Sequence, residues 1–144
     1  MIGNCLCKKI QFEIDGALPR LYQCHCSQCR KQSGATANTA TVVNAEKFRW
    51  LAGQRNISTW RHDSGFRSHF CTTCGCPVPN PLGNLPYIWI PVGLLDKTGH
   101  KDVFAHIFVG SKADWENTPT SGLVYDTVPE LSEFIAMLQQ PVTP

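Results

Sequence analysis

The sequence predicts a mainly β domain of short antiparallel strands followed by one C-terminal helix. Many short stretches alternate apolar and polar residues and are bounded by glycine and proline, which is typical of strands joined by tight turns. Only residues 129–140 combine sufficient length with a clear helical stripe of apolar positions. The chain has 144 residues, of which 42% are hydrophobic, so we expect one globular domain over residues 1–144.

The strand pattern is clearest where Ile10, Phe12 and Ile14 alternate with polar neighbours, as in a half-buried strand. A more apolar stretch, residues 85–95, predicts either a strand pair or one bent strand. The expected strands cover residues 8–15, 20–25, 36–43, 47–53, 56–62, 65–71, 85–95 and 102–110.

Two helices and one surface turn complete the expected elements. Residues 27–34 predict a short helix, with Ser27 as its N-cap and Gly34 as the residue that ends it. Residues 111–117 predict a surface turn. The C-terminal helix, residues 129–140, has one apolar stripe, made of Leu131, Phe134, Ile135 and Leu138.

Charge and hydropathy exclude several classes of protein. The net charge of +2, with no dense basic stripe, argues against a nucleic-acid-binding protein. No apolar run reaches the roughly 18 residues that a membrane-spanning helix needs. The N-terminal residues lack the basic and apolar regions of a signal peptide. We therefore expect a cytoplasmic protein, in a compartment where stable disulfides are rare.

Eight cysteines fall into three groups, and this clustering is the strongest functional signal in the sequence. In an extended chain, side chains two residues apart point to the same face, so such cysteines can converge on one point. A point that gathers several thiolates suits a soft metal ion. A disulfide framework and inert core thiols are the alternatives. The groups are Cys5 and Cys7; Cys24, Cys26 and Cys29; and Cys71, Cys74 and Cys76.

The sequence "CTTCG" predicts half of a closed zinc site. Cys71 and Cys74 have the spacing of a zinc knuckle, and Gly75 allows the backbone to turn its N–H groups toward the sulfurs. Tetrahedral zinc needs two more ligands. We expect Cys5 and Cys7, on one face of an edge strand, to complete a structural four-cysteine site.

The remaining group, Cys24, Cys26 and Cys29, predicts a different kind of site. Three protein ligands with an open fourth position are typical of catalytic zinc. The alternative is a closed structural site whose fourth ligand comes from elsewhere in the chain. The residues that could close it are Cys76, His25, His62 and His69.

Several neighbouring residues have less specific signals. His25 stands between two expected ligands, so an extended backbone should direct its side chain away from the metal, into a packing or supporting role. Cys76 is most simply a buried core residue, although it could also act as a redox partner. Arg30 and Lys31 could attract an anionic substrate, or could form a solvated helix face.

Three segments together resemble the glutathione-dependent formaldehyde-activating enzyme family, which includes the centromere-protein-V-like domains. They are "GNCLCKKIQFEI", "CHCSQCRKQSGA" and "HFCTTCGCPV". The resemblance covers about residues 3–110 and leaves residues 111–144 as a C-terminal extension. It implies a β-tent-like zinc-binding fold, with structural zinc at Cys5, Cys7, Cys71 and Cys74 and catalytic zinc at Cys24, Cys26 and Cys29.

The resemblance also implies an activity. Members of the founding type join formaldehyde and glutathione to give S-hydroxymethylglutathione, formally a carbon–sulfur lyase reaction. The implied cofactors are two zinc ions per chain, and the implied partner is a small thiol such as glutathione, with neither nucleic acid nor membrane. The sequence leaves assembly into a homo-oligomer open. A non-catalytic, zinc-stabilised binding module and a thiol redox protein that uses Cys76 are the alternatives.

Overall fold

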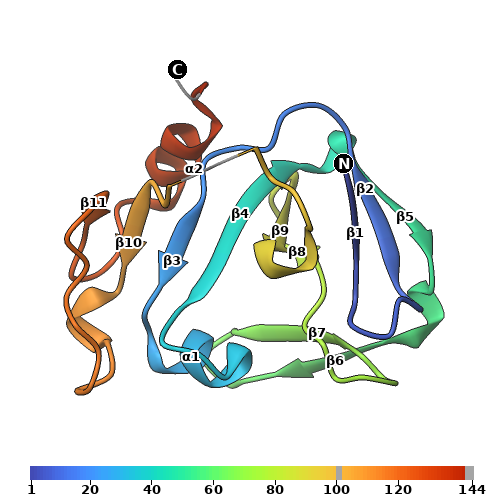
Figure 1. Cartoon of the computed structure of the whole chain (residues 1–144), viewed down its shortest axis with the longest axis horizontal. Coiled ribbons are helices and arrows are strands. Elements are labelled where there is room, and N and C mark those ends of the chain that lie inside the picture. Colours follow the sequence, from blue (N-terminus) through green and yellow to red (C-terminus); the bar gives the residue numbers. More distant parts are fainter. Residues whose placement is uncertain (100–101, 142–144) are drawn as a thin grey trace. The chain divides into compact units, whose positions relative to one another are not determined.

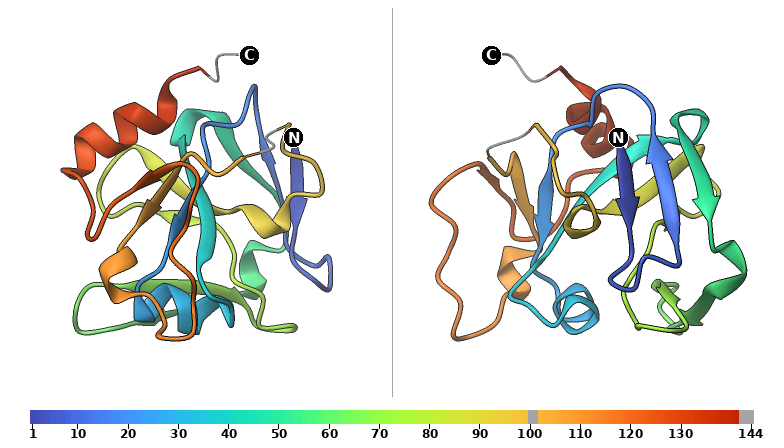
Figure 2. Two further views of the ribbon diagram at one scale, coloured as in Figure 1. Left: turned by 60° about the vertical axis from the view of Figure 1, so that its left-hand side comes forward. Right: turned by 45° about the vertical axis from the view of Figure 1, so that its right-hand side comes forward.

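The computed structural model describes residues 1–99 and 102–141 of the chain (Figures 1 and 2). The described residues form two compact units, each built from two separate stretches. The first unit contains residues 1–18 and 42–98, and the second contains residues 19–41 and the described part of 99–144. The assignment of residues 1–144 to a single domain stays a prediction.

The first unit is made almost entirely of strands. β1, β2 and β5 form one antiparallel sheet in that order, and β6 and β7 form a separate hairpin. In a third sheet, β9 is the neighbour of β4, and β8 pairs with β9. The strands are β1 (Ile2–Asn4), β2 (Gln11–Ile14), β5 (Phe48–Ala52), β6 (Ile57–Arg61), β7 (Arg67–Cys71), β8 (Asn80–Pro81) and β9 (Tyr87–Pro91). The unit also contains three 3₁₀ turns: Ala45–Lys47, Gln54–Asn56 and Val92–Leu94.

The alternation of apolar residues in β2 produces the core of the first unit. Ile10, Phe12 and Ile14 are fully buried, as their period of two predicts. The Phe12 ring stacks on Phe48 with centroids 5.6 Å apart and meets Trp50 edge to face at 6.2 Å. Phe12 belongs to β2, and Phe48 and Trp50 belong to β5, so this aromatic cluster packs the two neighbouring strands of the sheet together.

The second unit combines the other strands with both helices. Its elements are β3 (Tyr22–Cys24), α1 (Ser27–Ser33), β4 (Asn38–Asn44, of which the last three residues belong to the first unit), β10 (Ala105–Ile107), a 3₁₀ turn (Val109–Ser111), β11 (Leu123–Val124) and α2 (Leu131–Gln139). The strand order is β11-β10-β3-β4. β3 pairs antiparallel with β4, but β10 runs parallel to both β3 and β11. Figure 1 shows α1 directly after the end of β3.

Helix α2 covers the second unit with an apolar face. Phe134, Ile135 and Leu138 are buried, and the Phe134 ring packs edge to face on Tyr22 with centroids 5.3 Å apart. Leu131 was predicted to share this stripe, but it is 46% exposed because it stands at the start of the first helical turn. The stripe is therefore one residue shorter than the sequence pattern predicts.

The prediction of a mainly β fold with a C-terminal helix is confirmed, and each expected strand and helix has a counterpart. The N-cap of α1 was predicted wrongly: it is Cys26, whose sulfur accepts a hydrogen bond from Cys29 N at 3.4 Å, and not Ser27. Gly34 ends the helix in the left-handed conformation, as expected. The short strands β1, β8 and β11 were not among the expected strands.

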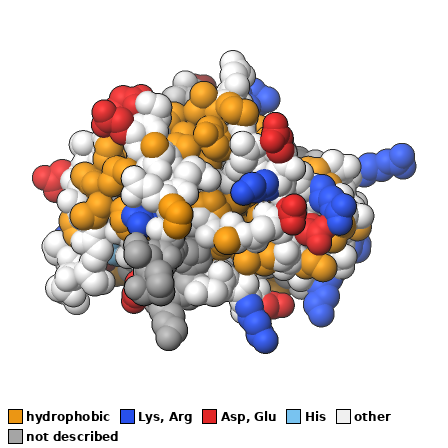
Figure 3. Space-filling model, turned by 90° about the horizontal axis from the view of Figure 1, so that it is seen from above, with side chains coloured by type: hydrophobic (Ala, Val, Ile, Leu, Met, Phe, Trp, Pro, Cys, Tyr) orange, Lys and Arg blue, Asp and Glu red, His pale blue; other side chains and the backbone are white. Residues whose placement is uncertain are grey.

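Two surface properties agree with the composition. Among the described residues, no helix has the length and apolar character needed to cross a lipid bilayer. On the face seen in Figure 3, Lys and Arg side chains stand among Asp and Glu, with orange apolar atoms between them. This mixture of charges gives no continuous basic surface on that face.

Gly53 lies so close to the backbone of Lys9 that a larger residue would not fit there. Its φ is +80°, and a Cβ atom there would lie 2.0 Å from the carbonyl oxygen of Lys9. Gly16 has a similar φ of +76° with no atom within 4 Å of such a Cβ. Gly16→Ala should cost about 1–2 kcal/mol through backbone strain alone, whereas Gly53→Ala should cost at least ~2 kcal/mol more. Urea unfolding measures both, and equal losses would contradict this account of Gly53.

Candidate metal centres

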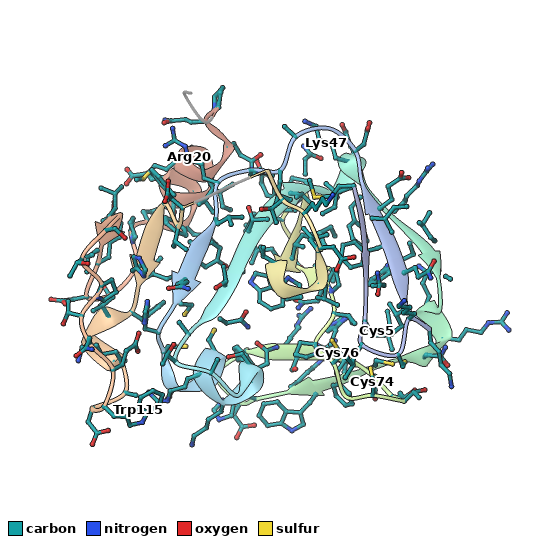
Figure 4. The ribbon with its side chains drawn as sticks, viewed as in Figure 1. Cys5, Arg20, Lys47, Cys74, Cys76 and Trp115 are labelled. Atoms are coloured by element: carbon teal, nitrogen blue, oxygen red, sulfur yellow. The ribbon has the colours of Figure 1, made fainter. Side chains whose placement is uncertain are left out.

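Four cysteine side chains of the first unit converge on one point. The sulfur atoms of Cys5, Cys7, Cys71 and Cys74 all lie within 4.8 Å of one another. Cys5 Sγ lies 3.6 Å from Cys7 Sγ, which lies 3.7 Å from Cys71 Sγ. Figure 4 labels Cys5 and Cys74, which reach this point from the β1–β2 turn and from the turn after β7. We call these residues the four-cysteine group.

Two tight turns bring the four sulfurs together. After β7, Gly75 N donates to Cys71 O at 2.8 Å, and the φ of Gly75 is +72°, which explains the glycine in "CTTCG". After β1, Lys8 N donates to Cys5 O at 2.9 Å, and Lys8 has the unusual φ of +62°. Ile10 N donates to Cys5 Sγ at 3.4 Å. Both turns therefore direct backbone N–H groups toward sulfur.

The prediction that Cys5 and Cys7 lie on one face of an edge strand is wrong. β1 ends at Asn4, and both cysteines lie in the turn that follows it. In this turn, which the hydrogen bond from Lys8 N to Cys5 O closes, the two sulfurs lie 3.6 Å apart.

Hydrogen bonds to sulfur give the thiols of this group different pKa values. Burial raises the pKa of the Cys74 thiol, but the backbone N–H groups of Cys76 and Cys7 outweigh it and lower the pKa to about 6. Burial also acts to raise the pKa of Cys71, but backbone N–H groups of Cys74 and Thr73 lower it below its usual value. The backbone N–H of Lys9 lowers the pKa of Cys7, yet burial and the neighbouring thiols raise it to about 11. The group therefore favours a mixture of thiolate and thiol that a metal ion would convert to thiolates.

Three cysteines of the second unit form the other cluster. The sulfur atoms of Cys24, Cys26 and Cys29 lie within 4.8 Å of one another. Cys24 ends β3 and is buried, Cys26 caps α1, and Cys29 lies in its first turn. No further histidine, cysteine or carboxylate among the described residues of the second unit joins these sulfurs at that spacing. We call these residues the three-cysteine group.

Hydrogen bonds among the three sulfurs of this group shift their pKa values in opposite directions. Hydrogen bonds from the thiols of Cys24 and Cys29 lower the pKa of Cys26 to about 2. The contact with Cys26 raises the pKa of Cys24 to about 12, and the contacts with Cys24 and Cys26 raise the pKa of Cys29. Binding a divalent ion to all three sulfurs would therefore release the protons of the other two.

The residue between the first two ligands points into a buried polar network. His25 is 1% exposed, and its Nδ1 lies 2.7 Å from Oε1 of Glu116. On its other side, His25 Nε2 lies 3.0 Å from His106 Nδ1. Thus His25 is directed toward His106 and Glu116, as its position in an extended segment predicts. His106 and Glu116 were missed because no motif or fixed spacing connects them to the cysteines.

Cys76 is not the core residue that the sequence predicts. Its side chain is half-buried, and its sulfur donates to Pro77 O at 3.5 Å. Burial, together with the nearby Cys74, Cys5 and Cys71, raises its pKa, although the backbone N–H of Leu6 opposes this. Cys76 belongs to the first unit, as do His62 and His69, and it lies outside the four-cysteine group.

Both cysteine groups fit a metal ion on the chemistry of their donors. Four sulfurs bound to one zinc ion at ~2.3 Å in a tetrahedron would lie roughly 3.8 Å apart, close to the 3.6 and 3.7 Å seen in the four-cysteine group. Thiolate ligands favour soft or borderline ions such as zinc. Two cysteine-rich groups that could each bind a metal ion are therefore present, and they comprise seven of the eight cysteines.

One protein-family model matches most of the chain. The family model described as glutathione-dependent formaldehyde-activating enzyme matches residues 1–111. That range contains all seven cysteines of the two groups and ends before Glu116.

Among solved structures, the chain is similar to the crystal structure of a Rhodobacter sphaeroides protein. The match has a TM-score of 0.55 and 22% sequence identity, and it covers 67% of this chain and 88% of that one. At this identity, the likeness supports the fold alone. The chain has no significant match among curated proteins.

The grouping of the cysteines predicts which thiol reacts in the metal-loaded protein. With zinc present, iodoacetamide should modify Cys76 and spare the seven grouped cysteines, because a metal-bound thiolate is a poor nucleophile. Removal of zinc with a chelator should expose the others, with Cys26 reacting early because its pKa is low. Peptide mass spectrometry measures the extent of modification at each cysteine. Protection of Cys76 together with reaction of Cys24 or Cys29 in the loaded protein would contradict the grouping.

Proposed function

The chain belongs to the glutathione-dependent formaldehyde-activating enzyme family, and on this premise we propose that it joins formaldehyde to glutathione at the three-cysteine group. The product is S-hydroxymethylglutathione, so the enzyme is a carbon–sulfur lyase in the formal sense. The observation that carries the proposal is the incomplete donor set: three convergent sulfurs and no fourth donor among the described residues of their unit.

The two groups have different roles in this proposal. Cys5, Cys7, Cys71 and Cys74 hold a structural zinc ion that ties the β1–β2 turn to the end of β7. Cys24, Cys26 and Cys29 hold a catalytic zinc ion. When bound there, zinc supplies Lewis acidity that lowers the pKa of a coordinated thiol, as it does for coordinated water.

The balance of the reaction defines what the protein must provide. The glutathione sulfur forms a bond to the carbonyl carbon of formaldehyde, the π electrons of the C=O bond move to oxygen, and that oxygen takes up the proton that the thiol lost. The protein must therefore hold a deprotonated thiol beside a small aldehyde. Near the three-cysteine group, Arg30 and Lys31 of α1 add positive charge that favours an anionic thiol.

The ends of α1 are consistent with binding of an anion. The first turn of α1 has no acidic residue, and both of its basic residues lie in its last turn. Arg30 is held by a hydrogen bond from its guanidinium to Ser111 O at 3.5 Å, while Lys31 is exposed. Glutathione is abundant in the reducing cytoplasm, and we place the protein there as part of this proposal.

The proposed activity can be measured by NMR with ¹³C-formaldehyde and glutathione. The wild-type protein should accelerate formation of the hydroxymethyl adduct above the spontaneous rate. Cys26→Ser should reduce that acceleration by at least ~100-fold, because it removes one of three ligands. Cys76→Ser is the matched control and should keep the wild-type rate. Adduct formation at the spontaneous rate, with both zinc ions bound, would instead indicate a non-catalytic zinc-stabilised module.

The two roles predict different consequences for stability. Wild-type protein should contain two zinc ions, and Cys74→Ser and Cys26→Ser should each lose one. Loss of structural zinc should cost at least ~3 kcal/mol of unfolding free energy, while loss of the other should cost about 1 kcal/mol. Elemental analysis and chemical denaturation provide both measurements. Equal destabilisation by the two variants would refute the division into structural and catalytic sites.

A further inference from the structure

We propose that Glu116, acting through the His25 side chain, is a positioning residue that directs the Cys24 and Cys26 sulfurs toward the metal of the three-cysteine group. The inference depends on the metal-binding part of the proposed function and goes beyond it. It gives a role to the C-terminal extension, which contains none of the cysteines.

The first step is the position of His25 between two ligands. Its backbone N donates to Ile107 O at 3.0 Å, and Cys24 is paired with Ile107 in the parallel β3–β10 ladder. Cys26 also has extended backbone, with φ −66° and ψ 157°. In such a segment, alternate side chains point to opposite sides. Whatever fixes the side chain of His25 on one side therefore fixes those of Cys24 and Cys26 on the other.

The second step is how tightly the His25 ring is held. Glu116 Oε1 lies 2.7 Å from Nδ1, and His106 Nδ1 lies 3.0 Å from Nε2, so both ring nitrogens have a neighbour. The rings of His25 and His106 are tilted by 42° with centroids 5.2 Å apart. A ring held at both nitrogens cannot rotate without breaking one of these contacts.

The third step concerns the cost of placing Glu116 there. Its side chain is only 10% exposed, and its Oε2 is buried without a hydrogen-bond partner among the described residues. Although Oε1 lies 2.7 Å from His25 Nδ1, Nδ1 also lacks a hydrogen bond of acceptable geometry among the described residues. A buried carboxylate with incomplete partners is a poor source of stability. Its presence here is better explained by the orientation it imposes on His25.

The surrounding backbone holds Glu116 and His106 in place. Glu116 N donates to Ala113 O at 3.1 Å, and Ala113 is buried. The neighbouring Trp115, labelled in Figure 4, is 67% exposed, so the turn directs adjacent side chains in different directions. After β10, Phe108 adopts a left-handed φ of +56° and donates through its N–H to Thr127 O at 2.8 Å. For a bulky residue this φ is strained, so the turn after β10 is held by its surroundings.

Zinc affinity tests the proposal, because it requires no turnover. The two-zinc protein is titrated with a chromophoric chelator, and native mass spectrometry follows the populations with two, one and no zinc ions. The zinc-release step that is absent when Cys26→Ser is titrated is assigned to the three-cysteine group. We expect Glu116→Ala to weaken zinc at that group by about 10–100-fold and to leave the four-cysteine group unchanged. The four-cysteine group is thus an internal reference for general loss of structure.

Two further variants separate positioning from packing. Glu116→Gln keeps an oxygen that can face His25 Nδ1 and should lose less than tenfold in affinity. Asp114→Asn removes the same charge from an exposed position two residues earlier in the same turn and should resemble wild type. Cobalt in place of zinc adds a spectroscopic readout. Glu116→Ala should shift the d–d bands of the three-cysteine site, and Glu116→Gln should restore them.

The outcomes distinguish this inference from the proposed function. Unchanged zinc affinity at the three-cysteine group in Glu116→Ala would overturn the inference and leave the enzymatic proposal standing. Equal weakening at both groups would also overturn it, because it would indicate a general structural role. Tight zinc that depends on Glu116, in a protein without turnover, would support the inference and remove the enzymatic proposal. A wild-type three-cysteine group that binds no zinc would overturn both.

Discussion

The convergence of several sulfur atoms on one point is the constraint on which the structure depends. Like-charged thiolates repel one another, so each group needs backbone N–H groups or a metal ion to hold it together. The four-cysteine group meets this need with two turns whose residues Lys8 and Gly75 both have positive φ. The three-cysteine group meets it with the start of a helix, where Cys26 accepts a hydrogen bond from Cys29 N. The same chemical requirement thus has two different backbone solutions.

The part of this design that could be predicted is local in the sequence. Cysteine spacing predicts both groups, and Gly75 follows from the turn that "CTTCG" requires. Ile10, Phe12 and Ile14 are buried as their alternation predicts. The error at Cys5 has a physical reason, because a spacing of two is compatible with a strand and also with a tight turn. The chain forms a turn closed by a hydrogen bond from Lys8 N to Cys5 O, and no glycine or proline in residues 5–8 signals it.

The part that could not be predicted depends on pairing between distant segments. β10 contains only three residues, and its parallel alignment with β3 places His106 beside Gln23 and Ile107 beside Cys24. Glu116 reaches His25 from a segment for which the sequence predicts only a surface turn. A histidine between two cysteines could be predicted to point away from the metal, but its partners come from 81 and 91 residues further along the chain.

The order of the segments along the chain has a consequence for biosynthesis. Every ligand of the four-cysteine group precedes residue 75, whereas β10 and Glu116, which support the three-cysteine group, come after residue 104. Because a ribosome releases the chain from its N-terminus, the closed group can take up its ion while the supports of the other group are still untranslated. If the chain binds two zinc ions as proposed, nascent chains would therefore acquire them one after the other, and a shortage of zinc during translation would first produce molecules that are folded around one ion and lack the second.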